Sequence, residues 1–169
     1  MSANSSFSAD SSPSVGPSES VGAPSVASAP AVKPPKHPAV LLPTDQDLVL
    51  KVIPMPGDCN ANGDIFGGWV MAQVDLAGSV IPARYTQGRM ATVAVNEFIF
   101  KQPVRVGDIL SFFSKLTRIG RTSITVKVEV YAERFRSQGS YIKVTEASLT
   151  YVAIDDAGQP REVPRPAGT

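Results

Sequence analysis

The sequence contains a single histidine, His37, which stands in a segment rich in serine, alanine and proline. The remainder of the chain therefore has no imidazole, which excludes Ser-His, Cys-His and other histidine-based acid–base mechanisms there. The same absence excludes the HExxH zinc motif and histidine-rich metal sites. An enzyme built from this sequence has to use carboxylates and backbone amides.

Cysteine is equally scarce, since Cys59 is the only one. One cysteine excludes an internal disulfide framework and a cysteine-cluster metal site, and it favours a reducing, cytoplasmic setting. Asp58 precedes Cys59 and no basic residue adjoins it, so nothing in the sequence activates this thiol as a nucleophile.

Net charge and long apolar runs are also lacking. The 16 basic and 15 acidic residues leave a formal net charge of +1, so no overall field attracts nucleic acid or an anionic membrane. No run approaches the ~20 apolar residues of a membrane helix, because Asp75 interrupts the best candidate. Neither a GxGxxG nor a GxxxxGK[ST] phosphate loop occurs. We therefore expect neither nucleic acid nor a membrane as a partner.

The 169 residues suit one domain preceded by a tail. Residues 1–44 have almost no large apolar side chains and are predicted to be disordered. The first basic residue is Lys33, so no secretory or mitochondrial targeting signal is recognisable. Residues 45–156 are predicted to form the folded domain, and residues 157–169 a polar, frayed C-terminal tail.

The folded part is predicted to contain one helix and five strands. DLVLKVIPM is a strand-like run that Pro54 and Pro56 stop. GWVMAQVDLAGSVI, from about Gly68 to Ile81, is apolar nearly all round a helical wheel, so we expect a helix buried on most faces and ended by Pro82. Four further strands are predicted in MATVAVNEFIF, DILSFFSKLTRI, RTSITVKVEVYAE and YIKVTEASLTYVAI.

The alternation of these strands predicts how they pack. Ile124, Val126, Val128 and Val130 point one way and polar residues the other, which indicates an antiparallel strand with one dry face. Strands of ~10 residues suit a twisted sheet that curls around the helix. The fold class is therefore α+β, and pairing of sheet edges in a symmetric dimer would cover exposed strands.

Asp75 is the residue that the helix pattern does not explain. It is the only charged residue between Asp64 and Arg84. On a helical wheel it shares a face with three small residues, Gly68, Ala72 and Ser79. A buried unpaired carboxylate is costly, so we expect Asp75 to reach solvent in a cleft or to meet hydrogen-bond donors. The two interpretations are a catalytic carboxylate and an exposed aspartate without a chemical role.

Gly67 and Gly68 stand where the predicted loop meets the helix. The first amides of a helix have no internal acceptor and carry partial positive charge, and glycine lets a substrate oxygen approach them. This favours an oxyanion-binding role, with a tight turn as the alternative. In the preceding loop, Asp64 is placed for catalysis or for capping the helix. Asn60 and Asn62 are either substrate-binding or ordinary turn residues.

The string DCNANGDIFGGWVMAQVD, followed in order by MATVAV, QPVRVGD, GRTSI and TEASLTYVAID, closely resembles the YciA-type acyl-CoA thioesterases of the hotdog-fold superfamily. The likeness runs from about Leu48 to Pro164 and leaves out the tail. It implies a five-stranded antiparallel sheet wrapped round one long central helix. It also implies homodimers formed by joining sheets, and a further assembly of three dimers.

The resemblance also implies roles for single residues. Asp75 matches the catalytic carboxylate, which acts across the dimer interface from the glycine pair of the other subunit. Gly67 and Gly68 match the residues whose amides polarise the thioester carbonyl, and Asp64 and Asn60 match loop positions that shape the site. Two positions depart from the family pattern. They are Cys59, where the family usually has threonine, and Asn96, where close relatives have a strand glutamate. Neither departure removes the catalytic acid, and Asn96 is expected to alter substrate preference.

The predicted function is hydrolysis of an acyl-CoA thioester to a carboxylic acid and CoA, with Asp75 as general base or, less favoured, as nucleophile. No metal or separate cofactor is expected, because thioesters are reactive and CoA is part of the substrate. Arg121, with Thr122 and Ser123, is the candidate for binding the CoA phosphates, since arginine pairs with phosphate in bidentate fashion. The alternative for Arg121 is a solvated turn residue.

Two other classes of protein compete with this prediction. A non-catalytic acyl-CoA-binding hotdog module would keep the glycine pair but would not need Asp75. A hotdog dehydratase or hydratase relies on a pocket histidine, and the predicted domain contains none. Acyl chain length depends on packing across the dimer and is left open.

Overall fold

The computed structural model describes residues 40–164, which contain one five-stranded sheet and one long helix. In chain order the elements are β1 (Asp47–Val52), the 3-10 turn η1 (Pro56–Asp58), α1 (Gly67–Thr86), β2 (Met90–Phe100), β3 (Ile109–Ile119), β4 (Ser123–Glu133) and β5 (Tyr141–Ala153). The predicted α+β class and all five predicted strands are therefore confirmed. Most of the predicted tail, residues 1–39, lies outside the described residues, and the domain boundaries stay predictions.

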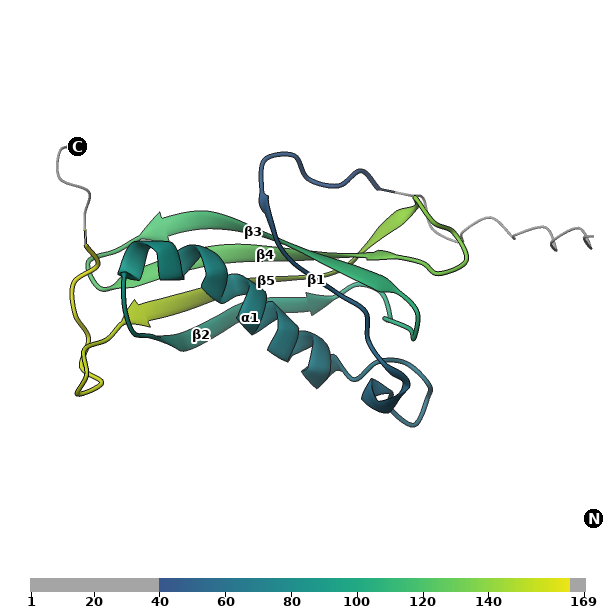
Figure 1. Cartoon of the computed structure of the whole chain (residues 1–169), viewed down its shortest axis with the longest axis horizontal. Helices are drawn as coiled ribbons and strands as arrows, with labels where there is room; N and C mark the ends of the chain where they lie inside the picture. Colours follow the sequence, from purple (N-terminus) through teal and green to yellow (C-terminus); the bar gives the residue numbers. More distant parts are fainter. Residues whose placement is uncertain (1–39, 165–169) are drawn as a thin grey trace, which may run out of the picture. The chain divides into compact units, whose positions relative to one another are not determined.

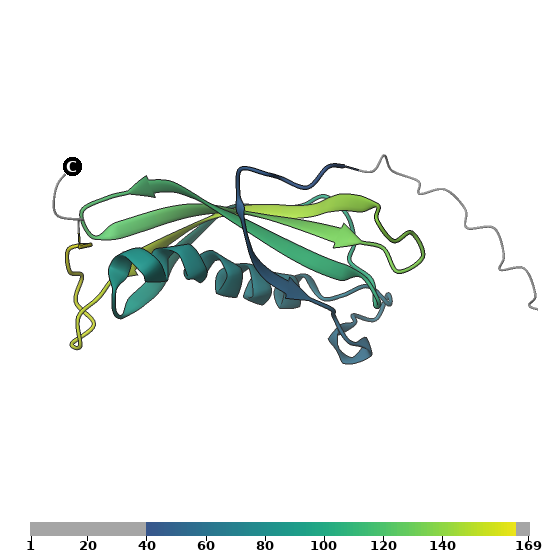
Figure 2. The ribbon, with the colours of Figure 1, turned by 45° about the horizontal axis from the view of Figure 1, so that its top comes forward.

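The strands form one antiparallel sheet in the order β1-β3-β4-β5-β2. Figures 1 and 2 show the long strands curving past one side of α1, as the prediction of a curled sheet required. β1 and β2 are the two edges. β2 has a register shift between Asn96 and Ile99, where Glu97 takes a positive φ of 52°.

The core lies between α1 and the concave face of the sheet. The inward residues of β4 are Ile124, Val126, Val128 and Val130, and all four are fully buried, as their alternation predicted. They belong to the same core cluster as four buried residues of α1, namely Val70, Val74, Ala77 and Ile81. Burial of one such aliphatic side chain contributes about 1.5–3 kcal/mol, so this layer fixes where α1 lies on the sheet.

The prediction that α1 is buried on most faces is wrong for a single chain. Met71 and Leu76 are exposed, and Trp69 and Val80 are half-buried. The reason is that one sheet covers only one side of a helix. The opposite side of α1 remains an apolar surface with no cover from the described part of its own chain.

α1 continues past Pro82, which the sequence predicted as its approximate end, and finishes at Thr86. A proline inside a helix removes a hydrogen bond and costs about 3 kcal/mol. Here Pro82 is buried, and the Arg161 guanidinium donates to the Thr86 carbonyl at 2.6 Å, which holds the last turn from outside. Gln87 then ends the helix in the left-handed conformation. Tertiary contacts therefore outweigh the local preference.

The outer face of the sheet is not uniformly solvated, which corrects the prediction of a single dry face. Glu129 of β4 is only 7% exposed there. The chain before β1 crosses this face, because the Val40 amide donates to the Tyr141 carbonyl of β5 and the Asp45 carboxylate meets the Lys115 ammonium of β3 at 2.6 Å. This crossing passes over β4, which lies between those two strands.

The segment after β5 is held by hydrogen bonds as far as Val163, so the prediction of a frayed tail from residue 157 is wrong for the part of it that the structure describes. The Arg161 amide donates to the Ala153 carbonyl, and the Val163 amide donates to the Arg121 carbonyl. Val163 is 5% exposed. Its side chain therefore adds to the core at the end of the sheet where α1 finishes.

Candidate active site

Asp75 lies half-way along α1 and is half-buried. Its Oδ1 accepts a hydrogen bond from the Thr92 hydroxyl of β2 at 2.8 Å and one from the Tyr151 hydroxyl of β5 at 3.1 Å. The sequence predicted that this carboxylate would reach solvent or meet donors, and the structure shows both. Within residues 40–164 its Oδ2 has no hydrogen-bond partner, so one oxygen is held and the other is free to accept a proton.

Tyr151 contacts Asp75 from the side of the core, and only 1% of this tyrosine is exposed to solvent. Its hydroxyl also lies 2.8 Å from the Asp75 backbone carbonyl. Burial, followed by the neighbouring Asp75 carboxylate, raises the pKa of Tyr151. The hydroxyl therefore stays protonated at neutral pH and remains a hydrogen-bond donor.

Gly78 makes room for this contact. A Cβ atom added at Gly78 would stand 2.5 Å from the Tyr151 hydroxyl oxygen. Sequence reasoning missed Thr92, Tyr151 and Gly78. The signal that could have found Tyr151 is the alternation of β5, which places it on the inward face with Leu149 and Ala153, where a buried tyrosine hydroxyl needs a partner.

Gly67 and Gly68 are the first two residues of α1, as predicted for the glycine pair. Phe66 precedes them as the N-cap and offers no side-chain hydrogen bond, so the first amides of the helix remain uncapped by any side chain. A Cβ added at Gly67 would meet the Phe100 ring at 3.1 Å, whereas Gly68 faces open space. The helix start therefore has the uncapped, accessible amides that oxyanion binding requires.

The loop before α1 is held by Asn60. Its Oδ1 accepts hydrogen bonds from the amides of Asn62 at 2.9 Å and Asp64 at 3.3 Å, which is the turn role that the sequence left open. Asn62 itself is exposed. The alternative that Asp64 caps the helix is wrong, because Phe66 is the N-cap. The Asp64 Oδ1 instead lies 4.0 Å from the Arg105 Nε.

One chain does not bring the carboxylate and the glycine pair together. Asp75 is eight positions after Gly67, which is about 12 Å along a helix that rises 1.5 Å per residue. A cavity of about 360 Å³ opens at the helix start and is lined by Gly67, Asp64, Asn60 and Phe100 among others, but not by Asp75. The candidate site is therefore divided within a single protomer.

Arg121, Thr122 and Ser123 lie at the other end of the sheet. The Thr122 carbonyl accepts from Ala153, which pairs with Met90 at the start of β2, whereas Gly67 is next to Phe100 at its end. The Arg121 guanidinium is 3.8 Å from the Glu162 carboxylate. Within one chain these three residues are therefore remote from the glycine pair, and their role in binding phosphate stays a prediction.

The remaining candidates show no chemistry of their own. The Cys59 Sγ lies 3.8 Å from the Gly63 carbonyl oxygen and is half-buried. Residues 40–164 hold no group of three or more His, Cys, Asp or Glu side chains suited to a metal ion. No helix in this part of the chain is both long and apolar enough to span a membrane.

Comparison with known proteins places this arrangement in a family. A family model described as the thioesterase superfamily matches residues 62–136. The acyl-CoA thioester hydrolase YciA of Escherichia coli (strain K12) is 42% identical over 120 residues, which are 70% of this chain and 91% of that protein.

Solved structures similar to this chain are also thioesterases. A hexameric thioesterase from Yersinia pestis superposes with a TM-score of 0.69 at 44% identity, covering 74% of this chain and all of the other. A hexameric hotdog fold thioesterase of Campylobacter jejuni superposes with a TM-score of 0.68 at 41% identity, covering 72% of this chain and 93% of the other. The fold and these relatives thus define a hotdog-fold thioesterase. Within that class, the chain belongs to the YciA-type acyl-CoA thioesterases.

Proposed function

We propose that this chain hydrolyses acyl-CoA thioesters to a carboxylic acid and CoA, with Asp75 as the general base. The observation that carries this proposal is the half-buried carboxylate whose Oδ1 is bound by two hydroxyl donors. This leaves Oδ2 to take a proton from an attacking water. The name of the Escherichia coli relative supports the reaction class.

The proposed reaction uses the carboxylate and the glycine amides in the same step. Water attacks the thioester carbonyl carbon while Asp75 takes its proton, and the oxyanion that forms is stabilised by the amides of Gly67 and Gly68. The C–S bond then breaks, and the leaving CoA thiolate receives the proton. We expect no metal or separate cofactor to be needed, so a chelator should leave the rate unchanged.

We further propose that each site contains Asp75 of one protomer and the glycine pair of its partner. The separation of about 12 Å along α1 supports this, because one helix cannot present both groups to one carbonyl. The uncovered side of α1, with Met71 and Leu76, and the edge strand β2, with Val93 and Val95, expose apolar side chains that a second copy would bury. Since the solved relatives from Yersinia pestis and Campylobacter jejuni are hexameric, we propose a trimer of dimers.

The direct test compares wild type with Asp75→Asn, which keeps the shape of the side chain but removes the base. Both proteins are incubated with short, medium and long acyl-CoAs while release of free thiol is followed. We expect the variant to lose about 10²–10⁴-fold in kcat, the usual contribution of a positioned general base. Light scattering on both proteins checks that the oligomer is the same.

Each alternative gives a different result. Full activity in Asp75→Asn with an unchanged oligomer contradicts the assignment of the base. If wild type binds acyl-CoA without releasing thiol from any member of the panel, the chain is a binding module rather than a hydrolase.

A further inference from the structure

The edge strand β2 contains a β-bulge. Its register with β5 shifts between Asn96 and Ile99, where β2 has two residues opposite one residue of β5. Glu97, the first of the two, is exposed and takes a φ of 52°. This left-handed conformation is sterically costly for a residue with a Cβ atom, and such conformations gather at functional sites.

The parts of β2 on either side of Glu97 are both held by β5. The part before the bulge pairs with β5 from Met90 to Asn96. In the part after it, the Ile99 carbonyl accepts a hydrogen bond at 2.6 Å from the hydroxyl of Thr145, which is fully buried. Since neither part can slide along β5, the surrounding structure imposes the left-handed conformation on Glu97.

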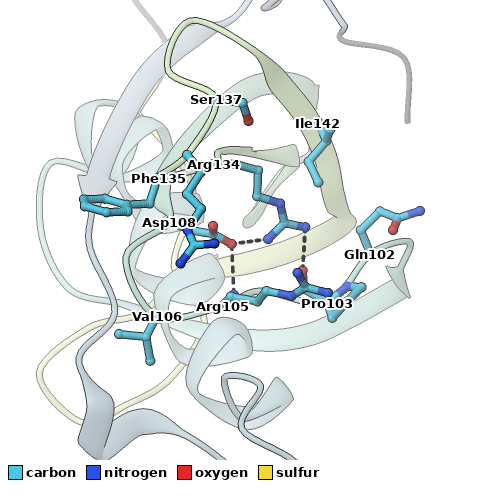
Figure 3. A pocket seen from close by; sticks show the side chains of 10 residues that line it. Gln102, Pro103, Arg105, Val106, Asp108, Arg134, Phe135, Ser137 and Ile142 are labelled. Atoms are coloured by element: carbon cyan, nitrogen blue, oxygen red, sulfur yellow. Dashed lines mark hydrogen bonds and ion pairs between the residues drawn. The ribbon is translucent and has the colours of Figure 1, made fainter. Parts of the chain in front are cut away.

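The chain just beyond β2 is fixed as well. The amides of Lys101 and Gln102 both donate to the Val144 carbonyl, at 2.8 and 3.3 Å. Figure 3 shows the next contact, in which the Arg134 guanidinium donates to the Pro103 carbonyl at 2.9 Å. The end of β2 is therefore held by hydrogen bonds on both of its sides.

Each part of β2 contacts one of the two groups of the proposed site. Thr92, before the bulge, donates to the Asp75 carboxylate at 2.8 Å. Phe100, after the bulge, has its ring against Gly67, where an added Cβ would stand 3.1 Å from the Phe100 Cζ. A bulge bends its strand and increases the local twist, so Glu97 stands where the direction of β2 changes between these two contacts.

The Phe100 ring gives the start of α1 an apolar cover on one side. It lines the cavity of about 360 Å³ together with Gly67. The ring also packs on Phe98 at a centroid distance of 4.9 Å, and Phe98 packs in turn against the core. Amides that an apolar surface shields from water stabilise an oxyanion more strongly than solvated amides do.

We propose that Phe100 is a positioning residue of the active site, whose ring shields the amides of Gly67 and Gly68 from water, and that the bulge at Glu97 holds the ring there. The inference deepens the proposed function, since it assumes that these amides bind the thioester oxygen. The alternative role of the bulge is to protect an open sheet edge from pairing, which would not involve Phe100.

The first test compares kcat and KM for one acyl-CoA in wild type, Phe100→Ala, Phe100→Leu and Ile99→Ala. Phe100→Ala should lose about tenfold in kcat, less than the 10²–10³-fold typical of removing an oxyanion donor. KM should change little, because the shielding favours the transition state over the bound ester. Phe100→Leu keeps an apolar side chain and should retain at least half of the rate. Ile99 is the exposed neighbour on the other face of β2, so Ile99→Ala is the matched control.

Two changes at Glu97 test the bulge. Glu97→Gly keeps the extra residue and removes the steric cost of the positive φ, so kcat should be unchanged and Tm should not fall. Deletion of Glu97 removes the bulge and should lower kcat about tenfold in an oligomer of unchanged size. The deletion combined with Phe100→Ala should lose no more than either change alone, because the bulge acts through the ring.

The outcomes separate this inference from the proposed function. Wild-type kcat in Phe100→Ala, an equal loss in Ile99→Ala, or a rise in KM alone overturns the inference and leaves hydrolysis intact. Full activity in the deletion variant shows that the bulge only protects the edge. If the deletion variant does not assemble, the Phe100 variants decide. A wild type that releases no thiol from any acyl-CoA contradicts the proposed function and the inference with it.

Discussion

The two oxygens of the Asp75 carboxylate have different surroundings, and this difference explains how an acid on a core helix can be chemically useful. Oδ1 is bound by hydroxyls from β2 and β5, which fix the plane of the carboxylate. Neither donor carries a charge, so Asp75 is oriented without an ion pair that would compete for its proton. Thr92 and Tyr151 are therefore positioning residues in the proposed mechanism.

We expect Tyr151→Phe to lower kcat about tenfold and to leave KM nearly unchanged. The reason is that the variant loses the hydroxyl that holds Oδ1 of Asp75, so the carboxylate is less well oriented toward the attacking water, whereas the groups that bind the substrate stay in place. The measurement is kcat and KM for wild type and the variant. Tyr141→Phe, on the same strand but away from Asp75, is the matched control, and an equal loss of kcat in both variants would contradict the positioning role.

The helix and the sheet pack closely at Gly78, where the Tyr151 hydroxyl of β5 hydrogen-bonds to the Asp75 backbone carbonyl of α1. A methyl group there would stand 2.5 Å from the tyrosine oxygen, and its next contacts, the Leu149 Cδ1 and the Tyr151 Cζ, are both at 3.4 Å. The conflict is thus with one oxygen atom.

This geometry predicts a coupling between the two positions. Gly78→Ala should lower the free energy of unfolding by about 1–3 kcal/mol in wild type, the usual cost of overpacking a core, and by clearly less in Tyr151→Phe. Urea unfolding of the four proteins of this double-mutant cycle measures the difference. Equal costs in both backgrounds would show that the methyl group conflicts with something other than the hydroxyl.

On the outer face of the sheet, β4 and β5 are joined by an ionic network. Burial opposes ionisation of Glu129, but hydrogen bonds from Lys127, Lys143 and Tyr131 outweigh it and lower the pKa of Glu129 to about 2. Hydrogen bonds from Lys101 and Lys143 likewise lower the pKa of Glu146 to about 2. Both ordinary values are 4.5, so folding favours the charged form of each glutamate.

Stability should therefore depend on pH in the acidic range. Because the folded-state pKa is depressed, the contribution of each glutamate is present above pH 4.5 and is lost as the pH falls toward 2, amounting to at most about 3 kcal/mol per group. Urea unfolding between pH 6 and 2.5 measures this loss. Glu129→Gln should be less stable at pH 6 and should lose less on acidification, whereas Asp156→Asn, in an exposed turn, should behave as wild type.

In the whole assembly, the proposed site is shared between protomers. The apolar side of α1 and the open edge of β2 lie on the surface of one chain, and Asp75 opens onto that same side of α1. Burial of this surface by a second copy and completion of the site would then be one event. Monomers would be inactive even if they were folded.

Mixed dimers test this arrangement. Asp75→Asn and Gly68→Val are each expected to be inactive, the second because a β-branched side chain blocks access to the amides. Co-expression of the two should restore roughly a quarter of wild-type activity. Half of the dimers are then hybrids, and each hybrid has one site with an intact carboxylate and an intact glycine pair. Activity no higher than in the single variants would place both groups of a site in one chain.

The sequence alone determined the order and type of the elements, because the alternation of the strands and the apolar pattern of the helix reflect the burial that folding requires. It also singled out Asp75 and the glycine pair, since a carboxylate is costly in an apolar helix and glycines at a helix start leave its amides accessible. The partners of Asp75 depended on the tertiary structure, because Thr92 and Tyr151 lie on strands that only the sheet order brings to one carboxylate. Tertiary contacts also decided the continuation of α1 past Pro82, which the Arg161 contact stabilises against local preference.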